Sequence, residues 1–90
     1  MNAPRRLAGV LVEDVPDSGE TVLVDRDRGK ILALNASGAA IWDLLDGQRD
    51  VGRLAGVLAE ATGIAEEDAT RDVAALIERL SQEGFLAPAE

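Results

Sequence analysis

The chain has 90 residues, enough for one domain with a thin hydrophobic core. It contains neither cysteine nor histidine, which excludes disulfides, zinc sites built from those residues, and catalysis by cysteine–histidine or serine–histidine–aspartate arrangements. The formal net charge of −8, from 17 acidic and 9 basic residues, disfavours nucleic acid as a partner because phosphate binding depends on lysine and arginine. We expect a single domain over residues 1–90, with no enzymatic activity and no cofactor.

The N-terminal segment carries no recognisable targeting signal. Its apolar run follows Arg5 and Arg6 but stops at Val12, before Glu13 and Asp14, and is too short for a secretory signal. Elsewhere the sequence has no apolar stretch long enough to span a bilayer. These features predict a cytoplasmic protein with no membrane partner.

The first third of the chain, about residues 7–35, is typical of β-strands. The apolar and β-branched runs Leu7–Val15, Thr21–Asp25 and Lys30–Asn35 are separated by turn-forming residues. The segment Arg26–Gly29 joins the last two runs, which predicts a β-hairpin whose glycine has a positive φ. Three antiparallel strands are therefore expected.

One motif in this region has the spacing of a metal site. Asp25 and Asp27 match the first two ligands of an EF-hand calcium loop. The glycine and glutamate that the loop requires further on are replaced by Lys30 and Ala36. A hairpin turn is the favoured interpretation, and no metal site is predicted.

The rest of the chain, about residues 37–84, has apolar residues at helical spacing in three runs. Capping residues and glycines bound each run. The expected helices are Ser37–Asp46, which begins after a cap at Asn35 or Ser37 and stops at Gly47; a second helix from the N-cap Asp50 to about Thr62; and Glu66–Glu83, followed by Gly84.

Three strands followed by three helices predict an α+β domain resembling a winged helix-turn-helix. The third helix takes the position of a DNA recognition helix, but its outward residues comprise five acids and two arginines. They are Glu67, Asp68, Arg71, Asp72, Glu78, Arg79 and Glu83. Such a helix would be repelled by a phosphate backbone, so DNA is not its expected partner.

Three segments together resemble the PqqD-like family, also called RiPP recognition elements. They are "LNASGAAIWDLLDG", "VGRLAGVLAEATG" and "DATRDVAALIERLSQEGFL", and the resemblance covers roughly residues 21–86. The matching positions are Leu34-Asn35, Ile41-Trp42, Leu44 to Gly47, Asp72-Val73, Leu76, Leu80 and Gly84-Phe85-Leu86.

The resemblance implies a non-enzymatic adaptor that binds the leader segment of a ribosomally made precursor peptide. Members of this family add the leader as a strand to their third strand and present it to modifying enzymes. The chain resembles most the discrete proteins of lasso-peptide pathways, whose partner is a leader peptidase of the cysteine-protease type, with a cyclase as a further partner. Two alternatives stay open: a pyrroloquinoline-quinone-type peptide chaperone, and an acidic winged-helix regulator.

The same resemblance implies a site at the edge of the third strand, in a groove walled by the third helix. Ile31 and Leu32 stand where lasso-type members often carry aromatics, which implies a less aromatic pocket. On the helix, an apolar residue lies between two charged ones along one stripe. The expected peptide-binding residues are Lys30, Ile31, Leu32, Ala33, Leu34, Asp72, Leu76 and Arg79.

The single tryptophan, Trp42, follows Ile41 at helical spacing. A lone tryptophan on an apolar helical stripe is more often part of the core than a ligand contact. We expect it to pack the first helix against the sheet and so hold the third strand in place.

Overall fold

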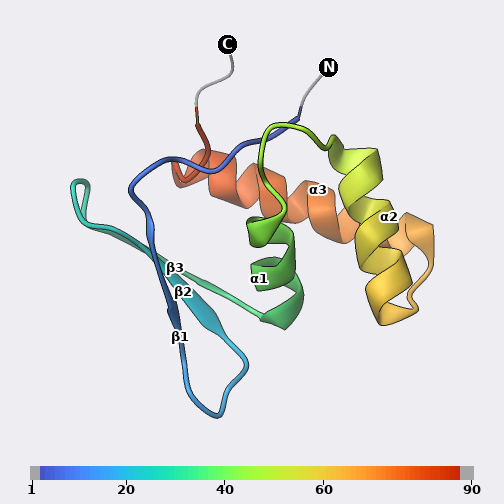
Figure 1. The fold of residues 1–90 in the computed structure, drawn as a ribbon, viewed down its shortest axis with the longest axis horizontal. Helices are drawn as coiled ribbons and strands as arrows, with labels where there is room; N and C mark the ends of the chain where they lie inside the picture. The colour runs from blue at the N-terminus through green and yellow to red at the C-terminus, as the bar shows by residue number, and fades with distance from the viewer. Residues whose placement is uncertain (1–2, 88–90) are drawn as a thin grey trace.

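The computed structural model describes residues 3–87, so the five terminal residues of the predicted domain 1–90 lie outside the described residues. Three strands precede three helices, as predicted (Figure 1). The elements are β1 (Leu11–Asp14), β2 (Thr21–Asp25), β3 (Lys30–Leu34), α1 (Ala36–Asp43), α2 (Val51–Thr62) and α3 (Glu66–Gln82). The α+β, winged helix-turn-helix-like class is confirmed.

The strands form one antiparallel sheet in the order β1-β2-β3. The β2–β3 hairpin has the predicted bounds at its turn, and Gly29 has a φ of 66°. Leu23 pairs with Leu32 and Thr21 with Leu34, so these side chains share the face that meets the helices. All four are buried, whereas Ile31 on the opposite face is 71% exposed.

Side chains cap the starts of α1 and α2, and glycines follow the ends of α2 and α3. The amide of Gly38 donates to Asn35 Oδ1 over 2.8 Å, and the amide of Arg53 donates to Asp50 Oδ1 over 2.9 Å. These bonds satisfy amides that the first helical turn leaves free. After α3, Gly84 takes a φ of 78°, which an L side chain rarely adopts.

Side chains from the sheet and all three helices form one core. Trp42 is 2% exposed and therefore belongs to this core, as predicted. The buried apolar residues are Leu23, Leu32, Leu34, Ile41, Trp42, Leu45, Leu54, Ala55, Leu58, Ala69, Val73, Leu80 and Phe85.

Two predicted boundaries were wrong because the N-terminal segment pairs elsewhere. The first strand was expected over Leu7–Val15, but the register of Leu11 with Val24 leaves earlier residues no partner on β2. Leu7 instead donates its amide to the carbonyl of Phe85 over 2.9 Å. Those residues therefore join the N-terminus to the C-terminal tail.

The first helix was expected to run to Asp46 but ends at Asp43. Beyond it, the carbonyl of Leu45 accepts the amide of Arg6 over 3.0 Å, and the amide of Gly47 donates to the carbonyl of Pro4 over 3.1 Å. The backbone here bonds to the N-terminal segment instead of continuing the helix. The third helix ends at Gln82, one residue before the expected Glu83.

In residues 3–87, no helix combines the length and the apolar character that crossing a bilayer requires.

Candidate functional site

One edge of β3 has no neighbouring strand. β3 pairs with β2 on one side, and in the described part of the chain no strand pairs with its other side. An unpaired strand edge presents amide and carbonyl groups that can hydrogen-bond a further strand. The edge of β3 is therefore a ready template for an extended peptide.

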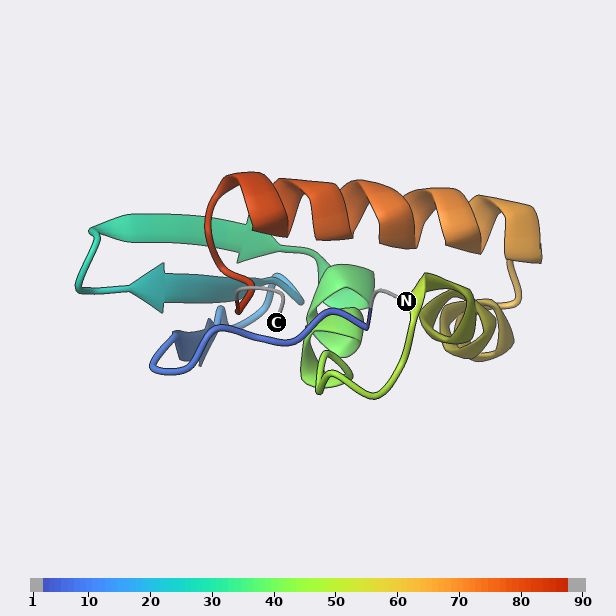
Figure 2. The same cartoon turned by 90° about the horizontal axis from the view of Figure 1, so that it is seen from above.

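A groove lies between this strand and α3, and we call it the β3–α3 groove. α3 runs along the side of the molecule nearest β3 and in the opposite chain direction (Figure 2). The groove holds about 360 Å³. Its lining residues are Ala33, Leu34, Asn35, Ser37, Gly38, Ile41, Leu58, Asp72, Val73, Ala75, Leu76 and Arg79.

The floor of the groove forms where β3 passes into α1. Asn35 caps α1, and this places Gly38 within the groove lining. A Cβ at Gly38 would lie 3.2 Å from Asn35 Oδ1 and 3.4 Å from Leu34 Cβ, both close contacts. The glycine therefore keeps the cap and the groove floor undisturbed.

The α3 wall combines an apolar centre with charged ends. Leu76 is half-buried, while Asp72 and Arg79 are exposed on either side of it. Seven residues of helix separate the two charges by roughly 10 Å. In residues 3–87 neither charged side chain has an ion-pair partner, so both are available to a ligand.

The eight residues predicted for peptide binding divide into two groups. Ala33, Leu34, Asp72, Leu76 and Arg79 line the same groove. The other three, Lys30, Ile31 and Leu32, lie earlier on the same strand and outside the groove lining.

The side chain of Leu32 is only 5% exposed and packs in the core, so it is not open to a peptide. Lys30 and Ile31 are exposed on β3.

Several lining residues were missed from the sequence. Asn35, Ser37 and Gly38 were read only as a helix start, and Ala75 was not singled out. The adjoining small residues after a strand were the available signal, because a small-residue turn lets another backbone approach closely.

Two carboxyl groups outside the groove have altered acidity. The Arg28 guanidinium donates to Asp25 over 2.6 Å and lowers the pKa of that carboxyl, although burial of the group opposes the shift. The amide of Gln48 donates to Asp46 over 2.9 Å and lowers its pKa, with help from Arg49. The hairpin pair Asp25–Arg28 is consistent with a turn at this position and not a calcium loop.

Among residues 3–87 no cluster of three or more carboxylates is arranged to hold a metal ion. The fold and the open edge together define a small winged helix-turn-helix-like module with a strand edge free beside a helix-walled groove.

The family profile described as "Coenzyme PQQ synthesis protein D (PqqD)" matches residues 20–86. The chain belongs to the PqqD family. A comparison with curated proteins found no match.

Three solved structures have the same fold. A lasso peptide synthetase B1 complexed with its leader peptide is 29% identical, with a TM-score of 0.78 over 97% of this chain and 100% of the other. TbiB1, solved in complex with the TbiA(beta) leader peptide, is 19% identical, with a TM-score of 0.77 over 96% of this chain and 98% of the other.

The third is a PqqD truncation of Methylobacterium extorquens PqqCD, described as a functional, stand-alone RiPP recognition element. It is 22% identical, with a TM-score of 0.73 over 94% of this chain and 88% of the other.

Proposed function

We propose that this chain binds the leader segment of a ribosomally synthesised precursor peptide, which adds as a fourth strand to the free edge of β3. The observation that carries the proposal is the unpaired β3 edge lying directly beside the β3–α3 groove. Membership of the PqqD family and the leader-peptide complexes of two structural relatives support it.

The two parts of the site have different tasks. Backbone hydrogen bonds to β3 supply affinity that depends little on the peptide sequence, while side-chain contacts in the groove supply specificity. Leu76 offers an apolar contact to one leader side chain. Asp72 and Arg79 fix the register of the peptide through oppositely charged leader groups.

Within residues 3–87 the sheet has a second edge without a paired strand, on β1, and its character favours β3 as the site. β1 is exposed along its whole length and carries Glu13 and Asp14. Neither the β3–α3 groove nor the hollow lined by residues 46–53 has lining residues from β1. A peptide at that edge would gain backbone bonds but little side-chain burial.

Within this function we propose a role in lasso-peptide biosynthesis. The support is the synthetase B1 structure, at 29% identity and covering 97% of this chain and 100% of the other. The chain then acts as an adaptor without catalytic activity, presenting the leader to a separate leader peptidase of the cysteine-protease type and to a cyclase. The second candidate is a pyrroloquinoline-quinone-type peptide chaperone, which the description of the matching family favours.

Fluorescence anisotropy with labelled synthetic leader peptides tests the proposal. The panel contains the leader of any short precursor peptide encoded near this chain's gene, the TbiA(beta) leader, and a pyrroloquinoline-quinone precursor peptide. Scrambled versions serve as controls. Saturable binding of one leader, with no binding of its scrambled form, is expected. Failure of every leader to bind the folded protein would contradict the proposed function.

A further inference from the structure

Arg28 connects the two walls of the β3–α3 groove from outside it. Its Nε donates to Asp25 Oδ2 over 2.6 Å, and its Nη2 donates to the carbonyl oxygen of Gly84 over 2.6 Å. The guanidinium also lies 6.0 Å from the centre of the Phe85 ring. One side chain thus joins the β2–β3 hairpin to the segment that ends α3.

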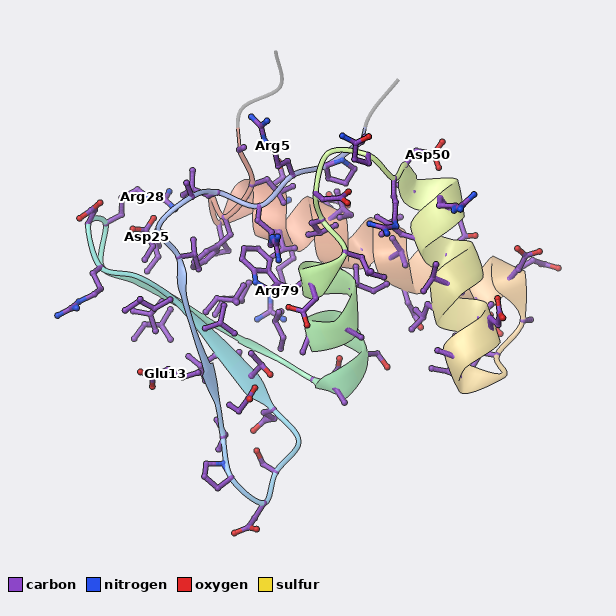
Figure 3. The ribbon with its side chains drawn as sticks, in the orientation of Figure 1. Arg5, Glu13, Asp25, Arg28, Asp50 and Arg79 are labelled. Atoms are coloured by element: carbon purple, nitrogen blue, oxygen red, sulfur yellow. The ribbon has the colours of Figure 1, made fainter. Side chains whose placement is uncertain are left out.

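These contacts lie at the ends of the two elements that form the walls of the groove. Arg28 lies two residues before β3, and Gly84 lies two residues after α3. Figure 3 shows Asp25 and Arg28 together at the hairpin end of the sheet. Gly38 and Ile41 of α1 line the groove between the same two walls.

One partner in these contacts is more sheltered from solvent than in an ordinary surface ion pair. The Asp25 side chain is only 10% exposed, and it also accepts the amide of Arg28 over 3.4 Å. Arginine can hold a carboxylate and a carbonyl at once because its donors form a rigid planar fork. Gly84 leaves room for this fork, since a Cβ there would collide with the guanidinium.

We propose that Asp25, Arg28 and the Gly84 carbonyl form a clamp that fixes the spacing between β3 and α3, and that Arg28 is thereby a positioning residue for leader binding. The inference rests on the proposed function. A leader must bond to the edge of β3 and contact α3 at the same time, so its affinity depends on a spacing that is set before it binds.

The test compares Arg28→Met with a matched control, Arg49→Met. Arg49 makes the same kind of contact, an i,i+3 ion pair to Asp46 over 2.7 Å with a further bond to the carbonyl of Leu44, but it lies outside the groove lining. Arg28→Met is expected to weaken leader affinity about tenfold, while Arg49→Met changes it less than about twofold. Equal leader affinities of Arg28→Met and Arg49→Met would contradict the proposed clamp.

Arg28→Lys provides the conservative variant and keeps a cation beside Asp25. An ammonium cannot bond to both acceptors at once as the guanidinium does. The leader affinity of Arg28→Lys should therefore fall between those of wild type and Arg28→Met. If Arg28→Met does not fold, this variant carries the comparison with Arg49→Met. A leader affinity for Arg28→Lys equal to that of Arg49→Met then counts against the clamp.

A measurement without peptide separates this inference from the proposed function. Amide NMR shifts of Arg28→Lys and Arg28→Met are compared with wild type in the absence of any leader. The clamp predicts changes along both walls, in residues 30–34 and 72–79. Changes confined to the neighbours of residues 28 and 84 would overturn it. If no leader binds wild type, the function fails while this measurement still decides the clamp.

Discussion

Single residues of α3 differ in what they contact, although they lie on adjoining helical stripes. Val73 and Leu80 are at most 1% exposed and belong to the core. Leu76 is half-buried and lines the groove. Helical spacing together with the family resemblance indicated this position, because a residue between the core stripe and the exposed stripe must be partly open to solvent.

Truncating Leu76 is expected to weaken leader binding. Leu76→Ala should cost about 1–2 kcal/mol of binding free energy, as for a typical interface anchor. Ile77→Ala is the matched control, since Ile77 is also half-buried and packs on the core but does not line the groove. The control should lower the free energy of unfolding and leave affinity unchanged. Titrations showing the same affinity for both variants would place the anchor elsewhere.

The carboxyl of Asp25 makes stability depend on pH. Its pKa in the folded protein lies below the ordinary value of 3.8 because Arg28 donates a hydrogen bond to it. A lowered pKa means that the stabilisation is fully present above about pH 4 and is lost as the pH falls through the folded value.

Urea unfolding of wild type and Asp25→Asn between pH 7 and 3 measures this effect. The variant should be less stable at pH 7, and the difference should shrink below about pH 4 as the wild-type carboxyl takes up a proton. A difference that stays constant down to pH 3 would contradict the role given to the Asp25–Arg28 pair.

At the scale of elements, β2, β3 and α2 follow from local sequence, whereas the ends of β1 and α1 do not. The β2–β3 hairpin and the Asp50 cap depend on neighbouring residues and were predicted correctly. The start of β1 and the end of α1 depend on the N-terminal segment bonding to Leu45 and Phe85. No local pattern records such distant pairing, which is why both predictions ran too long.

The residues that line the groove also divide into those that the sequence indicates and those that only the structure reveals. Its strand and helix walls could be inferred from periodicity and family resemblance, while the contribution of residues 35–38 required the observed turn into α1. The Arg28–Gly84 contact spans 56 residues of sequence and left no local signal.

A proline in β3 tests strand addition. Ala33 is exposed on an edge strand, where proline can be accommodated without breaking the core. Ala33→Pro removes a backbone donor and should cost leader binding about 1 kcal/mol or more. Val12→Pro makes the same change on the other edge strand, β1, and should leave affinity unchanged. Tight leader binding by a folded Ala33→Pro protein would exclude strand addition at this position.

At the scale of the whole molecule, backbone hydrogen bonds made by the N-terminal and C-terminal segments add to the packing of the core. The N-terminal segment bonds to the connection after α1 and to the tail after α3, and the amide of Ala87 donates to the carbonyl of Arg5 over 2.8 Å. These bonds tie the two ends of the described chain together, and within residues 3–87 no strand pairs with the outer edge of β3. The chain carries a net charge of −8.

That charge separates the peptide-binding account from the winged-helix regulator. An acidic α3 should give no measurable affinity for duplex DNA at physiological salt. An electrophoretic mobility shift assay with a mixed-sequence duplex and with DNA from the surrounding gene region provides the measurement. A sequence-specific shift would revive the regulator.

The central claim is that a leader peptide occupies the β3 edge and the β3–α3 groove. The most direct measurement is an amide NMR titration of the isotope-labelled protein with the leader that binds in the anisotropy panel. The account predicts that shift changes concentrate in residues 30–38 and 72–79, together with cross-strand contacts between peptide and β3 backbone protons. Changes centred on β1 or on α2, with residues 30–34 unaffected, would contradict it.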